Sequence, residues 1–145
     1  MKKIVFTILA FFITTAIFSQ EWMVNFEKAS IRAGKENKNM VMVFAGSDWC
    51  APCIKLEKNI LESDNFKKYA SEHWVLLKLD FPKRKQNQLS KEQQEHNDAL
   101  AEKYNKKGYF PLVLMVDKNG FVLGETSFKD ISSQSYVDEL IAFEK

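Results

Sequence analysis

The sequence is poor in the residues that metal centres and disulfide-stapled scaffolds need. Its 145 residues include two cysteines, Cys50 and Cys53, and two histidines, His73 and His96. Cysteines three residues apart cannot staple a fold, because a disulfide stabilises a protein more when it closes a longer loop. A zinc or copper site would need all four residues, but the histidines lie in different predicted elements and fit no usual ligand spacing. We therefore predict no metal site and no cofactor, and we interpret the cysteine pair as chemically active.

The sequence also lacks an excess of either charge. It has 21 lysines and arginines against 19 aspartates and glutamates, a formal net charge of +2. Lys2 and Lys3 account for this difference, so the rest of the chain is balanced. No global charge favours nucleic acid or an anionic membrane as a partner. Residues 83–89 are basic and polar, with three consecutive cations. We interpret them as an exposed, solvated loop in preference to a site for an anionic partner.

No apolar run is long enough for a typical membrane-spanning helix. Residues 4–18 are largely apolar but fall short of the ~20 residues that such a helix needs. Two lysines precede this run, and polar residues 19–21 follow it, which is the pattern of a secretory signal peptide. We predict a signal peptide at residues 1–19, with an uncleaved anchor as the less favoured alternative. Residues 20–145 are enough for one domain, which we expect to be a soluble monomer, periplasmic or secreted, with no membrane insertion.

Both cysteines lie in the segment Trp49-Cys50-Ala51-Pro52-Cys53, between an apolar run and a helical pattern. The apolar run, residues 40–45, suits a central strand buried on both faces. A helix beginning near Pro52 places Cys50 at its N-terminus, where unpaired N–H groups favour a negative charge. We therefore expect Cys50 to have a lowered pKa and to act as the nucleophile, with the more shielded Cys53 acting second.

The rest of the chain alternates helical and strand patterns. A helix is predicted to begin at Trp22, where apolar residues recur every three or four positions. Asn119-Gly120 lies between two apolar runs, which predicts a hairpin because both residues tolerate positive φ. Ser90 and Gln93 form a predicted capping box. Further helices are predicted from residues 52, 66, 90 and 133, and strands at 74–79, 112–116 and 121–123.

Two motifs identify a family resemblance. Trp49-Cys50-Ala51-Pro52-Cys53 follows one strand and Gly108-Tyr109-Phe110-Pro111 precedes another, as in the thioredoxin superfamily. Residues 44–50, 77–82 and 117–120 further resemble secreted or periplasmic thioredoxin-like proteins related to the C-terminal domain of the membrane thiol-disulfide interchange protein. The resemblance implies an α/β thioredoxin-like fold. We expect a central mixed sheet with helices on both faces, which lacks the usual first strand and begins with an N-terminal helix.

The resemblance also implies a client-binding site. Pro111 should follow a cis peptide bond beside the cysteines, which leaves the backbone of Phe110 free to pair with an extended client segment. Trp49, Ala51 and Pro52 should contact the same segment. The expected partners are proteins with disulfides and a membrane thiol that donates electrons. The alternative is a trans proline that merely opens an edge strand.

The sequence departs from the family pattern in two ways. Many thioredoxins have a buried aspartate in the strand before the active site, but Val43 and Phe44 supply no acid here. Asp48, which should lie at the surface, and Glu57 are weak substitutes. The dipeptide Ala51-Pro52 also lacks the histidine of strongly oxidising relatives, which predicts a lower reduction potential.

These observations predict an exported thiol-disulfide oxidoreductase that reduces protein disulfides through Cys50 and Cys53. Two alternatives remain open: a disulfide oxidase or isomerase, and a non-catalytic peptide-binding module with an incidental disulfide.

Overall fold

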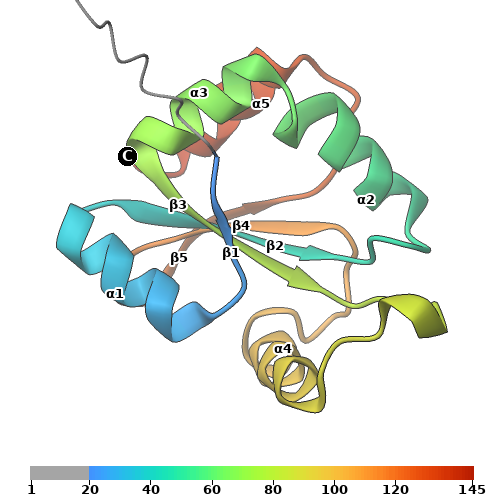
Figure 1. The fold of residues 1–145 in the computed structure, drawn as a ribbon. Coiled ribbons are helices and arrows are strands. Elements are labelled where there is room, and N and C mark those ends of the chain that lie inside the picture. The colour runs from blue at the N-terminus through green and yellow to red at the C-terminus, as the bar shows by residue number, and fades with distance from the viewer. Residues whose placement is uncertain (1–19) are drawn as a thin grey trace, which may run out of the picture.

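The computed structural model describes residues 20–145, drawn in colour in Figure 1. The predicted signal peptide, residues 1–19, lies outside the described residues. Among residues 20–145, no helix combines the length and the apolar character needed to cross a membrane.

Five strands form one mixed sheet, in the order β1-β3-β2-β4-β5. β1, β3 and β2 run parallel to one another, and β4 and β5 are antiparallel to their neighbours. This arrangement confirms the predicted mixed sheet. Six of the seven residues of the central β2 are buried, as the unbroken apolar sequence predicts. The strands are β1 (Trp22–Met23), β2 (Asn39–Ala45), β3 (Trp74–Asp80), β4 (Leu112–Val116) and β5 (Val122–Thr126).

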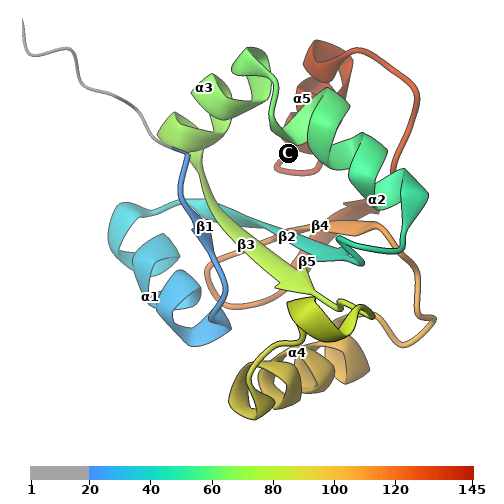
Figure 2. The same cartoon turned by 45° about the vertical axis from the view of Figure 1, so that its right-hand side comes forward.

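Helices cover both faces of the sheet, as Figures 1 and 2 show from two directions. One face is covered by α1 (Phe26–Glu36) and α4 (Lys91–Tyr104), and the other by α2 (Ala51–Leu56), α3 (Asp64–His73) and α5 (Ser133–Ala142). A π-helical turn, η1 (Glu57–Leu61), continues α2, and a 3₁₀ turn, η2 (Lys85–Asn87), follows β3. Alternate residues of β2 enter two separate cores, because successive strand side chains point to opposite faces.

Short polar side chains start four of the helices. Each accepts a hydrogen bond from a first-turn N–H, which satisfies a donor that the helix itself cannot. These residues are Asn25, Ser63, Ser90 and Ser132. The predicted capping box at Ser90 is only half formed. The Gln93 side chain does not return to Ser90 but donates to the Val24 carbonyl and to Asn97.

The N-terminal part of the chain differs from its prediction. Trp22 and Met23 form a short strand, β1, that pairs with Leu76 and Leu77 of β3. Because this strand is present, the prediction that the fold lacks its first strand is wrong. The N-terminal helix is present as well, but it begins at Phe26, after the cap Asn25. A two-residue strand is too short to show the period-two alternation that identifies strands.

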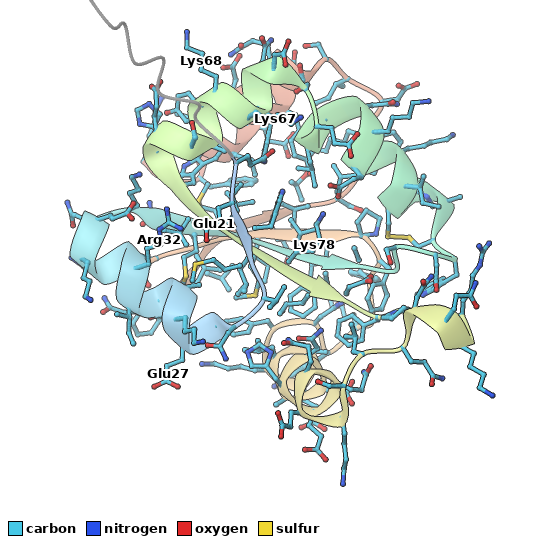
Figure 3. All side chains as sticks on the ribbon, viewed as in Figure 1. Glu21, Glu27, Arg32, Lys67, Lys68 and Lys78 are labelled. Atoms are coloured by element: carbon cyan, nitrogen blue, oxygen red, sulfur yellow. A yellow bond between two sulfur atoms is a disulfide. The ribbon has the colours of Figure 1, made fainter. Side chains whose placement is uncertain are left out.

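A charged contact fixes the segment before β1 against α1. The Arg32 guanidinium donates to Glu21 at 2.7 Å and to Glu36 at 2.8 Å, and Figure 3 labels Arg32 and Glu21 on adjoining segments. This contact orients the chain as it enters the sheet.

The predicted hairpin between β4 and β5 is confirmed, with a different turn. Of Asn119 and Gly120, only Gly120 has a positive φ, of 88°, and the side chain of Asp117 accepts hydrogen bonds from the N–H groups of Asn119 and Phe121. The aspartate thus organises the turn together with Gly120.

Candidate active site

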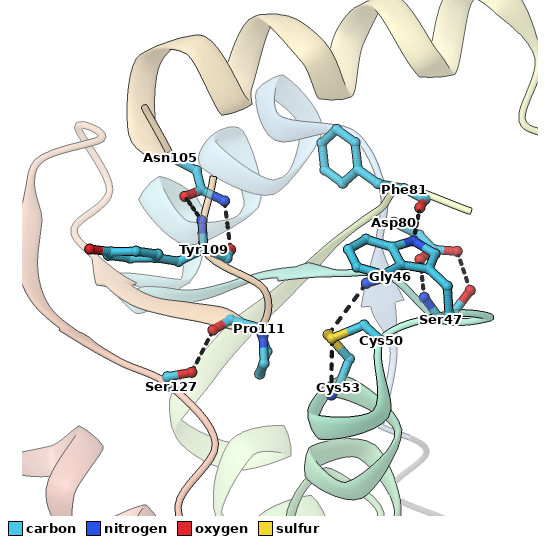
Figure 4. The surroundings of a disulfide bond; sticks show 11 residues. Gly46, Ser47, Cys50, Cys53, Asp80, Phe81, Asn105, Tyr109, Pro111 and Ser127 are labelled. Carbon is cyan, nitrogen blue, oxygen red and sulfur yellow. Dashed lines mark hydrogen bonds between the residues drawn. A yellow bond between two sulfur atoms is a disulfide. The ribbon is translucent and has the colours of Figure 1, made fainter. Parts of the chain in front are cut away.

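Cys50 and Cys53 form a disulfide at the start of α2 (Figure 4). Cys50 is the N-cap of the helix, and its sulfur accepts a hydrogen bond from the Cys53 N–H at 3.3 Å. The Gly46 N–H lies 3.5 Å from the Cys53 sulfur. Both cysteines are almost fully buried, with 4% and 5% of their surface exposed. The disulfide therefore lies at the junction of strand and helix that the sequence predicts, with backbone donors directed at both sulfur atoms.

The predicted second element of the site lies beside the disulfide. The peptide bond between Phe110 and Pro111 is cis, as the family resemblance predicts, and Figure 4 shows Pro111 facing the cysteines. Asn105 holds the preceding segment, because its side chain accepts from the Tyr109 N–H at 2.9 Å and donates to the Tyr109 carbonyl at 2.8 Å. The Ser127 hydroxyl donates to the Pro111 carbonyl at 2.6 Å. The backbone on both sides of the cis bond is thus fixed by side chains.

Trp49 forms one wall of the site. Its indole N–H donates to the Phe81 carbonyl at 2.7 Å, and its ring meets Phe110 edge-on with centroids 5.5 Å apart. Gly46 lies directly under the indole, where a Cβ atom would overlap the ring. Only glycine allows this close approach. Trp49 remains 38% exposed, so part of its surface is available for contact.

Two aspartates hold the loops around this wall. The Asp48 carboxylate accepts hydrogen bonds from the N–H groups of Lys83 and Arg84, both at 2.9 Å, and from the Asn87 side chain. These bonds, the one from Lys83 first, lower the pKa of Asp48 below its usual value. Asp80 accepts from the N–H and the hydroxyl of Ser47. Asp48 lies at the surface as predicted, and both acids serve to position loops.

An ion pair occupies the wall of a pocket that reaches Cys53. The Glu57 carboxylate and the Lys78 ammonium group are 2.6 Å apart. Both residues line the pocket together with Cys53, and the pocket has a volume of about 390 Å³. Lys78 lies opposite Val43 in the sheet, which is the region where the sequence lacks the expected acid. A carboxylate therefore reaches this pocket from the helix following the cysteines.

The histidines have other partners. His96 accepts a hydrogen bond from the Phe26 N–H at 3.0 Å, and His73 is the last residue of α3 and stacks on Tyr69. Within residues 20–145, no three histidine, cysteine or acidic side chains are grouped in a way that could hold a metal ion. The structure gives no support to the zinc or copper alternative.

Comparison with known proteins decides the family. Residues 21–118 match the family model described as thioredoxin-like. The chain belongs to this thioredoxin-like family. The match includes the cysteines and the cis-proline segment, so the motifs that suggest the resemblance lie inside the matched region.

Individual members of the family give a closer comparison. The chain is 31% identical to the disulfide bond reductase DsbH of Chlamydia pneumoniae, over 80% of this chain and 68% of that protein. A solved structure of the DsbH oxidoreductase superposes with a TM-score of 0.80 at 30% identity, covering 86% of this chain and 84% of that one.

A more distant neighbour shows the same fold. The C-terminal domain of DsbD from Neisseria meningitidis, in its oxidised form, superposes with a TM-score of 0.56 at 18% identity, covering 80% of this chain and 90% of that domain. Together with the Cys-x-x-Cys disulfide, the similarity to DsbH in sequence and in structure identifies this thioredoxin-like protein as a thiol-disulfide oxidoreductase whose pair is Cys50 and Cys53.

Proposed function

We propose that this protein is an exported reductase of protein disulfides. The observation that carries the proposal is the Cys50–Cys53 disulfide at a helix start, facing the cis-proline segment. Similarity to a protein described as a disulfide bond reductase supports the reducing direction. The apolar run before Ser19 supports export, and the compartment we propose is the periplasm or the exterior of a bacterial cell.

The reaction is a two-step thiol–disulfide exchange. In the reduced protein, the Cys50 thiolate attacks one sulfur of a client disulfide, forms a mixed disulfide and releases the first client thiolate. The Cys53 thiolate then attacks the Cys50 sulfur, which closes the Cys50–Cys53 disulfide and releases the second client thiolate. Two electrons pass from the protein to the client, and the client thiolates take protons from solvent. A dithiol donor, which we propose to be a membrane protein, must restore the reduced form.

The client segment would lie along the backbone before Pro111. Among the described residues, neither the N–H nor the C=O group of Phe110 has a hydrogen-bond partner. Two unpaired backbone groups beside the disulfide suit the addition of an extended segment, whose main chain supplies the bonds regardless of its sequence. Trp49, with its exposed face, and the exposed residues Ala51 and Pro52 complete the proposed contact surface.

The second step requires Cys53 to lose its proton, and we propose Glu57 as the acceptor. Cys53 is 5% exposed and its thiol would sit at the end of the pocket that Glu57 and Lys78 line. One water molecule in this pocket could pass the proton to the carboxylate. The ammonium group of Lys78, 2.6 Å away, orients that carboxylate.

Replacing Glu57 by glutamine should slow resolution of the mixed disulfide by about a hundredfold at pH 7. The defect should shrink as the pH rises, because hydroxide then removes the Cys53 proton without help from a carboxylate. Rapid-quench alkylation measures the resolution rate directly. Glu62→Gln is the matched control, because Glu62 lines the same pocket but makes no ion pair with Lys78. Equal slowing in both variants, or no slowing in Glu57→Gln, would refute the role.

The reductase assignment is tested by insulin reduction with dithiothreitol as the electron donor. We expect the protein to accelerate precipitation of the insulin B chain relative to dithiothreitol alone. An oxidase or isomerase would instead be more efficient in forming or rearranging disulfides in a reduced, unfolded protein. A peptide-binding module would still bind unfolded protein after alkylation of Cys50, with no turnover before or after.

A further inference from the structure

A basic loop lies against the active-site tryptophan. Lys83, Arg84 and Lys85 follow β3, and all three are exposed. From its sequence alone this run is expected to be a solvated loop, which requires only that the cations face water. The structure adds two features that a merely solvated loop does not need.

The first feature is that the loop is fixed to the cysteine motif. Asp48, two residues before Cys50, accepts hydrogen bonds from the backbone of Lys83 and of Arg84, and from the side chain of Asn87. Because the Asp48 carboxylate binds the backbone N–H groups of Lys83 and Arg84, the charged ends of these two side chains are not used in holding the loop. Within residues 20–145, none of the three cations lies within 4.0 Å of a carboxylate. Against the two nearby carboxylates, Asp48 and Asp80, the three cations leave an excess of positive charge at a fixed place.

The second feature is the position of Lys83. Its ammonium nitrogen lies 3.8 Å from the centroid of the Trp49 ring, a cation–π contact. Trp49 is itself fixed by its bond to the Phe81 carbonyl and by the absence of a side chain at Gly46. Lys83 is therefore held over the residue that adjoins the nucleophile.

The opposite side of the site also carries positive charge, because Lys103, Lys106 and Lys107 line a pocket beside Tyr109 together with Glu125. Figure 4 shows Tyr109 and Phe81 on either side of the disulfide. The Lys107 ammonium lies 5.8 Å from the centroid of the exposed Tyr109 ring. Glu125 lines the groove beside Tyr109, and Lys129 in that groove is paired with Glu139. Both sides are thus positive, but among the described residues it is Lys83, on the Trp49 side, whose ammonium group lies over the side chain next to the nucleophile.

We propose that the loop formed by Lys83, Arg84 and Lys85 selects client segments that carry aspartate or glutamate beside the disulfide-bonded cysteine. This inference rests on the proposed function, because it concerns which disulfides the same site reduces. An acidic side chain next to the client cysteine would meet Lys83 as the client sulfur approaches Cys50. Charge complementarity of this kind raises the rate of encounter more than the final affinity, and salt weakens it.

The test compares three disulfide-bonded peptides that differ only beside the cystine, with glutamate, glutamine or lysine at those positions. Stopped-flow tryptophan fluorescence measures the second-order rate constant with which the reduced protein attacks each peptide. At an ionic strength of about 0.02 M we expect the acidic peptide to react about tenfold faster than the neutral one. At about 0.5 M salt the ratio should fall to about two. The lysine peptide should be the slowest of the three.

Variants distinguish an effect of Lys83 itself from an effect of the net charge of the protein. Lys83→Glu should reverse the order of the acidic and basic peptides, and Lys83→Arg should keep the wild-type order. Lys68→Glu makes the same change in net charge on α3, at the end of the molecule labelled in Figure 3, and should leave the order and the rates unchanged. The quantity compared is the ratio between peptides within one variant, so a loss of folded protein does not imitate the effect.

Each outcome bears on one of the two proposals. Equal rates for the three peptides would refute the selection of acidic segments and leave the reductase function intact. The same reversal in Lys68→Glu would also refute it, because net charge alone would then explain the preference. Failure of the wild-type protein to reduce any peptide would refute the function itself.

Discussion

Replacing Cys53 by serine should convert the protein into a covalent trap for its clients, whereas replacing Cys50 by serine should abolish reaction with them. Without Cys53 the mixed disulfide at Cys50 cannot be resolved, so it accumulates. Without Cys50 there is no attacking thiolate at the start of α2. Because turnover needs both steps, each single variant should lose essentially all multiple-turnover activity.

The assignment of roles follows from the contacts of the two sulfur atoms. Cys50 is the N-cap, and its sulfur accepts the Cys53 N–H at 3.3 Å, a bond that favours the thiolate once the disulfide opens. Cys53 lies within the first turn, behind Gly46 and at the end of the pocket that contains Glu57. The two cysteines are almost equally buried, at 4% and 5% exposed, so the expected greater shielding of Cys53 is not observed, and the position of Cys50 at the helix start is what assigns it the attack.

The measurement is non-reducing electrophoresis of each variant after incubation with a disulfide-bonded client. Cys53→Ser should give a band at the summed mass that dithiothreitol removes, and the double variant Cys50→Ser/Cys53→Ser should give none. If Cys50→Ser accumulates the mixed disulfide instead, the roles of the two cysteines are reversed. Cys53 would then be the attacking cysteine, and the proposal that Glu57 accepts its proton in the second step would be wrong.

The sequence could predict the elements whose signals are local. The apolar run 40–45, the capping residue Ser90 and the Asn119-Gly120 turn each depend on neighbours in the chain, and the structure has a strand, a helix start and a hairpin at these places. The sequence does not predict β1, because two residues are too few to show a periodic pattern. This strand forms by pairing with β3, which lies more than fifty residues further along the chain.

The site could be predicted only in part for the same reason. The cysteine motif and the cis proline are continuous in sequence and belong to a known family pattern. The contact between Lys83 and Trp49 and the ion pair between Glu57 and Lys78 join separate elements. The last of these depends on a π-helical turn after α2, and no residue pattern predicted that turn.

The reduction potential of the Cys50–Cys53 pair should lie near the thioredoxin value of about −270 mV and far from the strong-oxidant value of about −120 mV. The dipeptide between the cysteines is the physical reason. Ala51 offers no side-chain donor, Pro52 has no N–H, and both are exposed. The helix start and the Cys53 N–H therefore stabilise the thiolate almost alone, so the reduced form gains little and the disulfide remains the more stable state. Equilibration with glutathione buffers, followed by alkylation, measures the potential.

The variant Pro52→His supplies the donor that the dipeptide lacks and should raise the potential by at least about 30 mV, a tenfold shift in the equilibrium with glutathione. Ala51→Ser is the matched control at the neighbouring position, where a short hydroxyl side chain should change the potential much less. The ~150 mV between thioredoxin and the strong oxidant corresponds to about 7 kcal/mol for two electrons, more than a neighbouring surface charge such as Asp48 supplies. A wild-type potential above about −170 mV would overturn the reductase proposal and favour an oxidase or isomerase, since the pair would then withdraw electrons from its clients.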